Sequence, residues 1–116
     1  MKLDIEGGEL HALHGALAML RKSQPEVIME INNQLIAAAG ITRPELFAVM
    51  KASGYVGVQP LSVNELDWFF TASEQRLNRV RARVEAAYTA TFCGQRRCGE
   101  VLVAIGEDAD RDWRSA

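Results

Sequence analysis

Three carboxylates stand close together near the start of the chain, where an apolar segment runs into two glycines. Asp4 and Glu6 alternate with apolar residues, and Glu9 follows the Gly7–Gly8 pair. This alternation is typical of a strand, and paired glycines end it. In open α/β sheets the carboxyl ends of the strands line the ligand crevice. Asp4, Glu6 and Glu9 could therefore accept a proton from a small-molecule nucleophile or hold that molecule in place.

The same three carboxylates also fit a plain structural role. Glu9, at the start of a helix, would be stabilised by the positive end of the helix dipole. Asp4 and Glu6 could be solvated groups at the end of a strand, with no substrate beside them. The residue types alone leave both interpretations open.

A second pair of polar residues follows the next apolar run. Val27 to Ile31 is nearly continuously apolar, which is typical of a strand covered on both faces. Glu30 and Asn32 stand at its end. If the two strands are neighbours in a parallel sheet, Glu30 and Asn32 line the same crevice and would bind the substrate. Polar residues at the junction of a strand and a loop explain the pair equally well.

Two histidines and two cysteines permit a zinc site on paper. His11 and His14 lie one helical turn apart, and four residues separate Cys93 from Cys98. Such a set of two nitrogens and two sulfurs would suit zinc. In a reducing cytosol, however, paired cysteines are usually plain thiols. We therefore expect free thiols and no bound metal.

Basic residues recur along the segment after Ser73. Apolar residues recur there at helical spacing, so the arginines occupy the other faces of a helix. Aromatic side chains do not interleave with them, and Glu74 and Glu85 interrupt the series. A solvated helix face is predicted rather than a phosphate-binding surface. The arginines are Arg76, Arg79, Arg81 and Arg83.

Strands and helices alternate in the first half of the chain and would position these groups. Leucines at helical spacing predict an amphipathic helix over residues 9–22, which Pro25 follows. Thr42 and Pro44 mark the start of another helix and Gly54 its end. The strands are predicted over residues 1–6, 26–31 and 55–60.

The second half of the chain is predicted to be mostly helical. Ser62 and Glu65 have the spacing of a capping box ahead of an aromatic cluster, and a further helix begins at Ser73. A last strand is predicted over residues 99–106, and the tail over 108–116 is expected to be frayed.

Composition limits the class of protein. The 116 residues are 48% hydrophobic and 24% charged, which suits one folded domain. A net charge of −2 offers no general attraction for nucleic acid or an anionic membrane. The chain has no long apolar run for a membrane span and no signal-peptide pattern at its start, so a cytoplasmic location is expected.

Several segments together resemble one enzyme family. KLDIEGGELHALHGA, at residues 2–16, resembles the strand-four motif of the FkbM family of S-adenosylmethionine-dependent methyltransferases. PEVIMEIN, at 25–32, looks like the next strand of that family, and LFAVMKASGY, at 46–55, looks like the next helix. The likeness covers about residues 1–60, and GEVLVAIGE, at 99–107, would be the final strand.

The resemblance implies a fold and an activity. The fold would be the carboxyl-terminal half of a Rossmann-like class I methyltransferase, an α/β domain with a mostly parallel sheet, an antiparallel edge strand and flanking helices. Its parts would be the family-like units over 1–60, a helical insertion over 61–98, the final strand over 99–107 and the tail over 108–116.

The implied donor is S-adenosylmethionine, and the acceptor is a hydroxyl of a sugar or another small molecule. The resemblance favours a catalytic role for Asp4, Glu6 and Glu9. Glu30 and Asn32, at the end of the next strand, are the candidate acceptor-binding residues because of their position. Family members bind the donor on strands that come before this motif, and the 116 residues do not contain those strands. This chain alone is therefore expected to bind the donor weakly and to be inactive.

A different class of function also fits the chain. It could be a non-catalytic α/β interaction module, or a remnant of an enzyme, that associates with copies of itself. The strand over 1–6 would normally lie inside a sheet, so its outer edge would present unpaired backbone groups. A homo-oligomer through this edge is expected.

Overall fold

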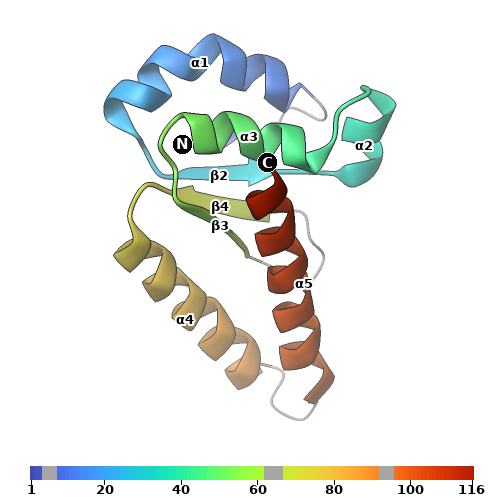
Figure 1. Ribbon diagram of the computed structural model, residues 1–116. Helices are drawn as coiled ribbons and strands as arrows, with labels where there is room; N and C mark the ends of the chain where they lie inside the picture. Colours follow the sequence, from blue (N-terminus) through green and yellow to red (C-terminus); the bar gives the residue numbers. More distant parts are fainter. Residues whose placement is uncertain (4–7, 62–66, 92–95) are drawn as a thin grey trace.

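A computed structural model describes residues 1–3, 8–61, 67–91 and 96–116 of the chain. Within these residues one helix separates β1 from β2, two helices separate β2 from β3, and two long helices follow β4 (Figure 1). The elements are β1 (Lys2–Leu3), α1 (Glu9–Ser23), β2 (Val27–Glu30), α2 (Asn33–Ala38), α3 (Arg43–Ala52), β3 (Gly57–Pro60), β4 (Asp67–Thr71), α4 (Glu74–Thr91) and α5 (Arg96–Ser115).

The four strands form one mixed sheet in the order β1-β2-β4-β3. β1 is parallel to β2, whereas β4 is antiparallel to both β2 and β3. The α/β class is confirmed, but the predicted mostly parallel sheet is not, because two of the three pairings are antiparallel. The reason is that the chain returns through β4, which inserts between β2 and β3 instead of extending the sheet. The predicted antiparallel edge strand is therefore also wrong, because the antiparallel strand lies inside the sheet.

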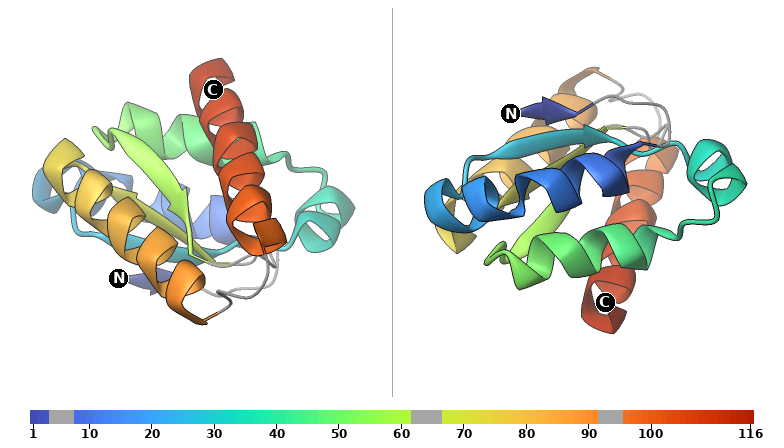
Figure 2. Two further views of the ribbon diagram at one scale, coloured as in Figure 1. Left: turned by 90° about the horizontal axis from the view of Figure 1, so that it is seen from below. Right: turned by 90° about the horizontal axis from the view of Figure 1, so that it is seen from above.

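One face of the sheet carries most of the hydrophobic core. Val27 and Met29 on β2 pair with Phe70 and Trp68 on β4, and Val58 on β3 pairs with Phe70 from the other side. All five side chains are buried. Helices α1 and α3 cover this face, as the view from above shows (Figure 2), and bring Leu13, Leu20, Leu46, Phe47 and Met50 into the same cluster.

The helices on the core face begin and end where local chemistry predicts. Thr42 Oγ1 accepts a hydrogen bond from the Glu45 N–H at the start of α3, and Pro44 occupies the first turn. Gln24 ends α1 in the left-handed conformation and donates its side-chain amide to the Ser53 carbonyl. The predicted helix over 9–22 and the helix start near Thr42 are confirmed.

Tyr55 ties the end of α3 to the turn before β2. Its hydroxyl donates to the Pro25 carbonyl, and the side chain is buried. Burial raises the pKa of the Tyr55 phenol, so the group stays neutral and remains a donor. This contact fixes the spacing between the loop that enters β2 and the loop that enters β3.

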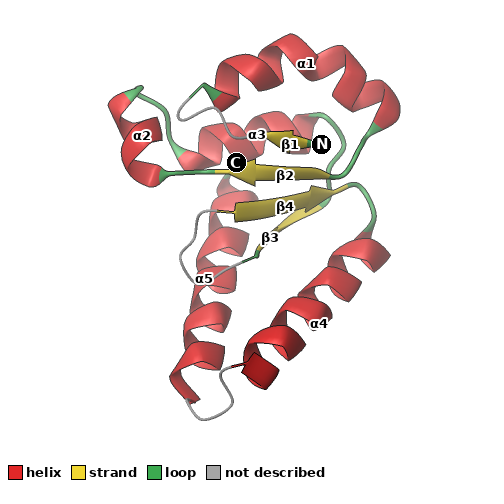
Figure 3. Ribbon diagram, turned by 180° about the vertical axis from the view of Figure 1, so that it is seen from behind, coloured by secondary structure: helices red, strands yellow, loops and turns green. Residues whose placement is uncertain are grey.

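Helix α4 covers the opposite face of the sheet, over β3 and β4 (Figure 3). A Cβ placed on Gly57 would come within 2.5 Å of Leu77 Cδ2, so glycine lets α4 approach β3 closely. Arg81 on α4 donates to Gln59 on β3 and to Asp110 on α5. The predicted helix after Ser73 is confirmed, and Ser73 Oγ caps it by accepting from the Arg76 N–H.

The predicted strand over 99–106 is wrong, because these residues belong to helix α5. Ile105, Ala109 and Trp113 are spaced by four residues, as one face of a helix requires, and Ile105 and Ala109 are buried. A short apolar run such as VLVAI does not distinguish a buried strand from a buried helix. The assignment of residues 99–107 as the family's final strand is wrong for the same reason.

The position of the last strand is taken by β4 instead. Residues 67–71 were predicted as part of a helix, yet they pair with both β2 and β3. Trp68 and Phe70 fill the core face while Phe69 is buried on the other face. A strand buried on both faces is continuously apolar, which explains three aromatics in a row. Ser62 and Glu65 lie outside the described residues.

The tail over 108–116 is ordered helix rather than frayed chain. Asp112 forms an ion pair with Arg43 on α3 at 2.6 Å, and Trp113 packs against Phe47 and Phe70. Lys51 donates to the Trp113 carbonyl. The tail is fixed because its one large apolar side chain completes a core cluster.

Candidate functional site

The candidate site is the carboxyl end of the sheet, defined as the end at which β1, β2 and β3 finish. Leu3 pairs with Met29 in parallel register, so the chain leaves β1 beside the end of β2. Glu30 pairs with Asp67, the first residue of β4, and the Leu61 N–H donates to the Asp67 carbonyl. Residues from all four strands therefore meet at this end.

Two of the predicted catalytic residues, Asp4 and Glu6, lie outside the described residues. Glu9 is the first residue of α1, and its side chain also lies outside them. Gly8 precedes α1 and accepts the first helical hydrogen bond, from Ala12. Leu3 at the end of β1 and Gly8 before α1 are the described residues on either side of this segment. The roles of the three carboxylates stay predictions.

Asn32 has a definite structural task. Its Oδ1 accepts hydrogen bonds from the Gln34 and Leu35 N–H groups, at 3.0 and 3.2 Å, and so caps α2. Substitution of an N-cap asparagine typically costs about 1 kcal/mol of stability. The predicted role of Asn32 in acceptor binding stays a prediction. It can only involve side-chain atoms of Asn32 that are not used to cap α2.

Glu30 lies half-buried at the end of β2, and Asp67 stands directly opposite it on β4. Paired residues on antiparallel strands point to the same face with about 5 Å between their Cβ atoms. The carboxyl end therefore presents two adjacent carboxylates on the face away from the core. Sequence reasoning missed Asp67 because it placed residues 67–71 in a helix, where Asp67 would have no strand partner.

The arginines of α4 divide into two groups. Arg76 forms an ion pair with Glu26 at 3.0 Å, and Arg81 forms one with Asp110 at 3.1 Å. Arg79 and Arg83 are exposed. The predicted solvated face is correct for Arg79 and Arg83, whereas Arg81 joins α4 to β3 and α5.

Two of the four residues of the hypothetical zinc set, His11 and His14, have described side chains. His11 and His14 are exposed on α1. Cys93 lies outside the described residues, as does the side chain of Cys98. Among the described residues, no group of three or more His, Cys, Asp and Glu side chains is placed to hold a metal ion.

Helices α1 and α3 also form a groove, here called the α1–α3 groove, on the outside of the core face. It is lined by His14, Leu17, Arg21, Ala48, Val49 and Ala52. None of these residues was predicted as functional, because at sequence level they belong to two ordinary amphipathic helices. Only the packing of α1 beside α3 brings them together.

Comparison with known proteins finds no matching family model, no matching curated protein and no matching solved structure. Among the described residues, no helix combines the length and apolar character needed to cross a membrane.

Proposed function

We propose that residues 1–116 form the acceptor-binding half of an S-adenosylmethionine-dependent methyltransferase similar to the FkbM family. The observation that carries the proposal is the sheet. Parallel β1 and β2 are joined through α1, and an antiparallel last strand pairs with β2 and β3. The resemblance implies a mostly parallel sheet with an antiparallel edge strand. The antiparallel strand of this sheet is β4 instead of residues 99–107, and it lies between β2 and β3 rather than at the edge.

The position of the polar residues supports the same proposal. In open α/β sheets, ligands bind beyond the carboxyl ends of the strands. Glu30 and Asp67 lie at that end, and the chain that carries Asp4 and Glu6 leaves β1 there. The segment that most resembles the family is therefore attached to the end of the sheet at which such enzymes bind ligands.

The proposed chemistry is transfer of a methyl group to a hydroxyl. The donor supplies a methyl group on a positively charged sulfur. The carboxylate of Asp4 or Glu6 accepts the proton that the acceptor hydroxyl loses. Neighbouring polar groups such as Glu30 hold the acceptor in line with the methyl group, and this positioning supplies much of the rate enhancement.

The donor itself would be held mainly by other residues. Dinucleotide and related cofactors bind at a glycine-rich turn after a first strand, with an acidic residue after the second strand. Residues 1–116 do not contain these units before Asp4. The donor-binding half would thus be supplied by a longer form of the protein or by a separate chain.

The first test is titration of the 116-residue chain with S-adenosylmethionine in a calorimeter. Because the resemblance places the main donor contacts outside residues 1–116, the dissociation constant is expected to be weaker than about 10 μM, or roughly −7 kcal/mol. Tighter binding with a stoichiometry of one would show that the donor site lies within these residues and would contradict the half-site proposal.

The second test changes the acidic residues within the assembled enzyme. Asp4→Asn and Glu6→Gln should each lower kcat by about tenfold or more, because a general base typically contributes at least that much. Donor affinity should stay within a few fold, since the donor is held elsewhere. Glu74→Gln is the matched control, because Glu74 begins α4 at the opposite end of the sheet and is exposed. Unchanged turnover in both variants would show that Asp4 and Glu6 do not take part in catalysis and have a structural role.

A second candidate, a non-catalytic module that associates with itself, is favoured by the edge of the sheet. Among the described strands, β1 pairs only with β2, so its outer side is open to another strand. In a twofold dimer this edge would pair with its own copy. Light scattering on the calorimetry sample shows whether the chain is a dimer. A dimer that shows no methyl transfer, alone or assembled with a donor-binding half, would favour the module.

A further inference from the structure

The α1–α3 groove is separate from the carboxyl end of the sheet. It has a volume of about 250 Å³, with His14, Leu17 and Arg21 on one wall and Ala48, Val49 and Ala52 on the other. Pockets for drug-sized ligands usually occupy about 300–1,000 Å³. The groove therefore suits a small molecule better than a peptide, a nucleotide or a second protein surface.

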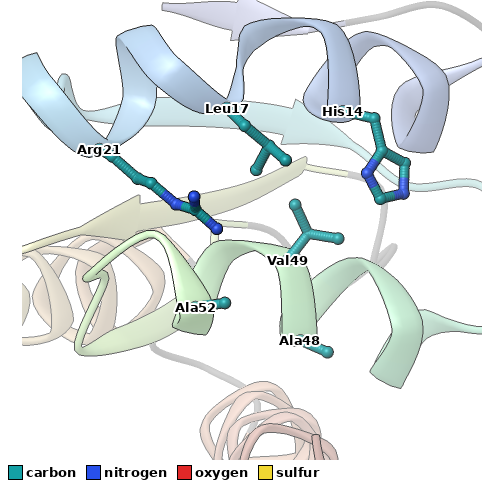
Figure 4. Close-up of a pocket in the computed structure, with 6 residues that line it drawn as sticks. All are labelled: His14, Leu17, Arg21, Ala48, Val49 and Ala52. Atoms are coloured by element: carbon teal, nitrogen blue, oxygen red, sulfur yellow. The ribbon is translucent and has the colours of Figure 1, made fainter.

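The middle of the groove is apolar. Leu17 on α1 and Val49 on α3 point toward each other, and the short side chains of Ala48 and Ala52 leave the space beside them open (Figure 4). Covering such a surface is favourable because apolar area is removed from water. A ligand with an alkyl or aryl body would gain this energy, whereas a fully polar ligand would not.

Polar groups stand at the two ends of the groove. His14 and Arg21 are separated by two helical turns of α1, about 10 Å along its axis, and both point from α1 toward α3 (Figure 4). Arg21 forms no ion pair or hydrogen bond with any described residue, whereas Arg43, Arg76 and Arg81 each bind a carboxylate. The residues that line the groove include no acid.

We propose that the α1–α3 groove binds a small amphipathic carboxylate, with an alkyl or aryl body of medium length. The carboxylate pairs with the Arg21 guanidinium, whose planar N–H groups match two carboxylate oxygens. The apolar body lies over Leu17 and Val49 and ends near His14. This site is independent of methyl transfer, because the residues that form it are not those of the carboxyl end.

Octanoate is a suitable probe, with octan-1-ol as the uncharged control. In an ¹H–¹⁵N NMR titration, octanoate should produce saturable shifts for residues of α1 and α3, with a dissociation constant on the order of 1 mM or tighter. Octan-1-ol should bind about fivefold more weakly, which corresponds to loss of one exposed charge pair. Shifts that do not saturate, or that centre on the carboxyl end of the sheet, would overturn the proposal.

Two substitutions test the groove directly. Arg21→Gln should weaken octanoate binding by about fivefold, whereas Lys22→Gln, which removes the same charge from the next residue, should leave it unchanged. Ala52→Leu should fill the groove and abolish saturable binding, whereas Ala18→Leu, an exposed position outside the lining, should not. Equal affinity in the Arg21 and Lys22 variants would contradict the assignment even if the Ala52 variant failed to fold.

Discussion

Replacement of Phe47 by alanine is expected to lower the free energy of unfolding by about 4 kcal/mol, which is a large share of the roughly 5–15 kcal/mol that stabilises a typical domain. Phe47 is fully buried, and its ring packs against rings from two other elements. The centroid distances are 6.1 Å to Trp68, 5.7 Å to Phe70 and 5.7 Å to Trp113. Removal of the ring leaves a cavity between α3, β4 and α5 that a sheet and two helices cannot easily close.

Urea denaturation followed by circular dichroism measures this loss. Leu35→Ala is the control, because Leu35 is 39% exposed on α2 and its truncation should change stability by about 0.5 kcal/mol or less. A loss below about 1.5 kcal/mol for Phe47→Ala would show that the three elements do not share one aromatic cluster.

Replacement of Trp113 by alanine should cost about 3 kcal/mol, at the lower end for a large aromatic because Trp113 is only half-buried. Its ring packs against Phe47 and Phe70, at 5.7 and 6.3 Å between centroids. The neighbouring Asp112 binds Arg43, whose guanidinium lies 4.9 Å from the Trp68 ring centre. The variant should therefore weaken the attachment of the last turns of α5 to α3 as well.

Hydrogen exchange complements denaturation for this variant. The last turns of α5 should lose protection, while β2 and β4 keep relatively more of it, because the helix end opens before the sheet does. Arg114→Ala is the matched control, since Arg114 is exposed on the adjacent position of the same helix and should change stability by about 0.5 kcal/mol or less. A Trp113→Ala variant as stable as the Arg114→Ala variant would mean that the tail is frayed after all.

The candidate site was only partly accessible from sequence. The alternation that ends in Asp4 and Glu6, and the apolar run that ends in Glu30, correctly indicated neighbouring parallel strands. Asn32 was recognised as a polar residue at the end of β2, but its capping of α2 requires the backbone geometry of the following turn. Asp67 and the α1–α3 groove depend on contacts between distant segments, which no local pattern encodes.

The sequence by itself determined the elements whose signals are local. Helix α1, the cap at Thr42 and the apolar strand β2 follow from spacing and capping within a few residues, so neighbours along the chain were sufficient. The tertiary structure alone decided the fate of the two ambiguous apolar runs. Residues 67–71 form the antiparallel strand because one partner strand is available on each side, β2 and β3. Residues 99–106 form a helix because Ile105, Ala109 and Trp113 then complete the core beside β3 and α3. Both runs are apolar enough for either structure, and only the free energy of packing against the rest of the chain distinguishes the alternatives.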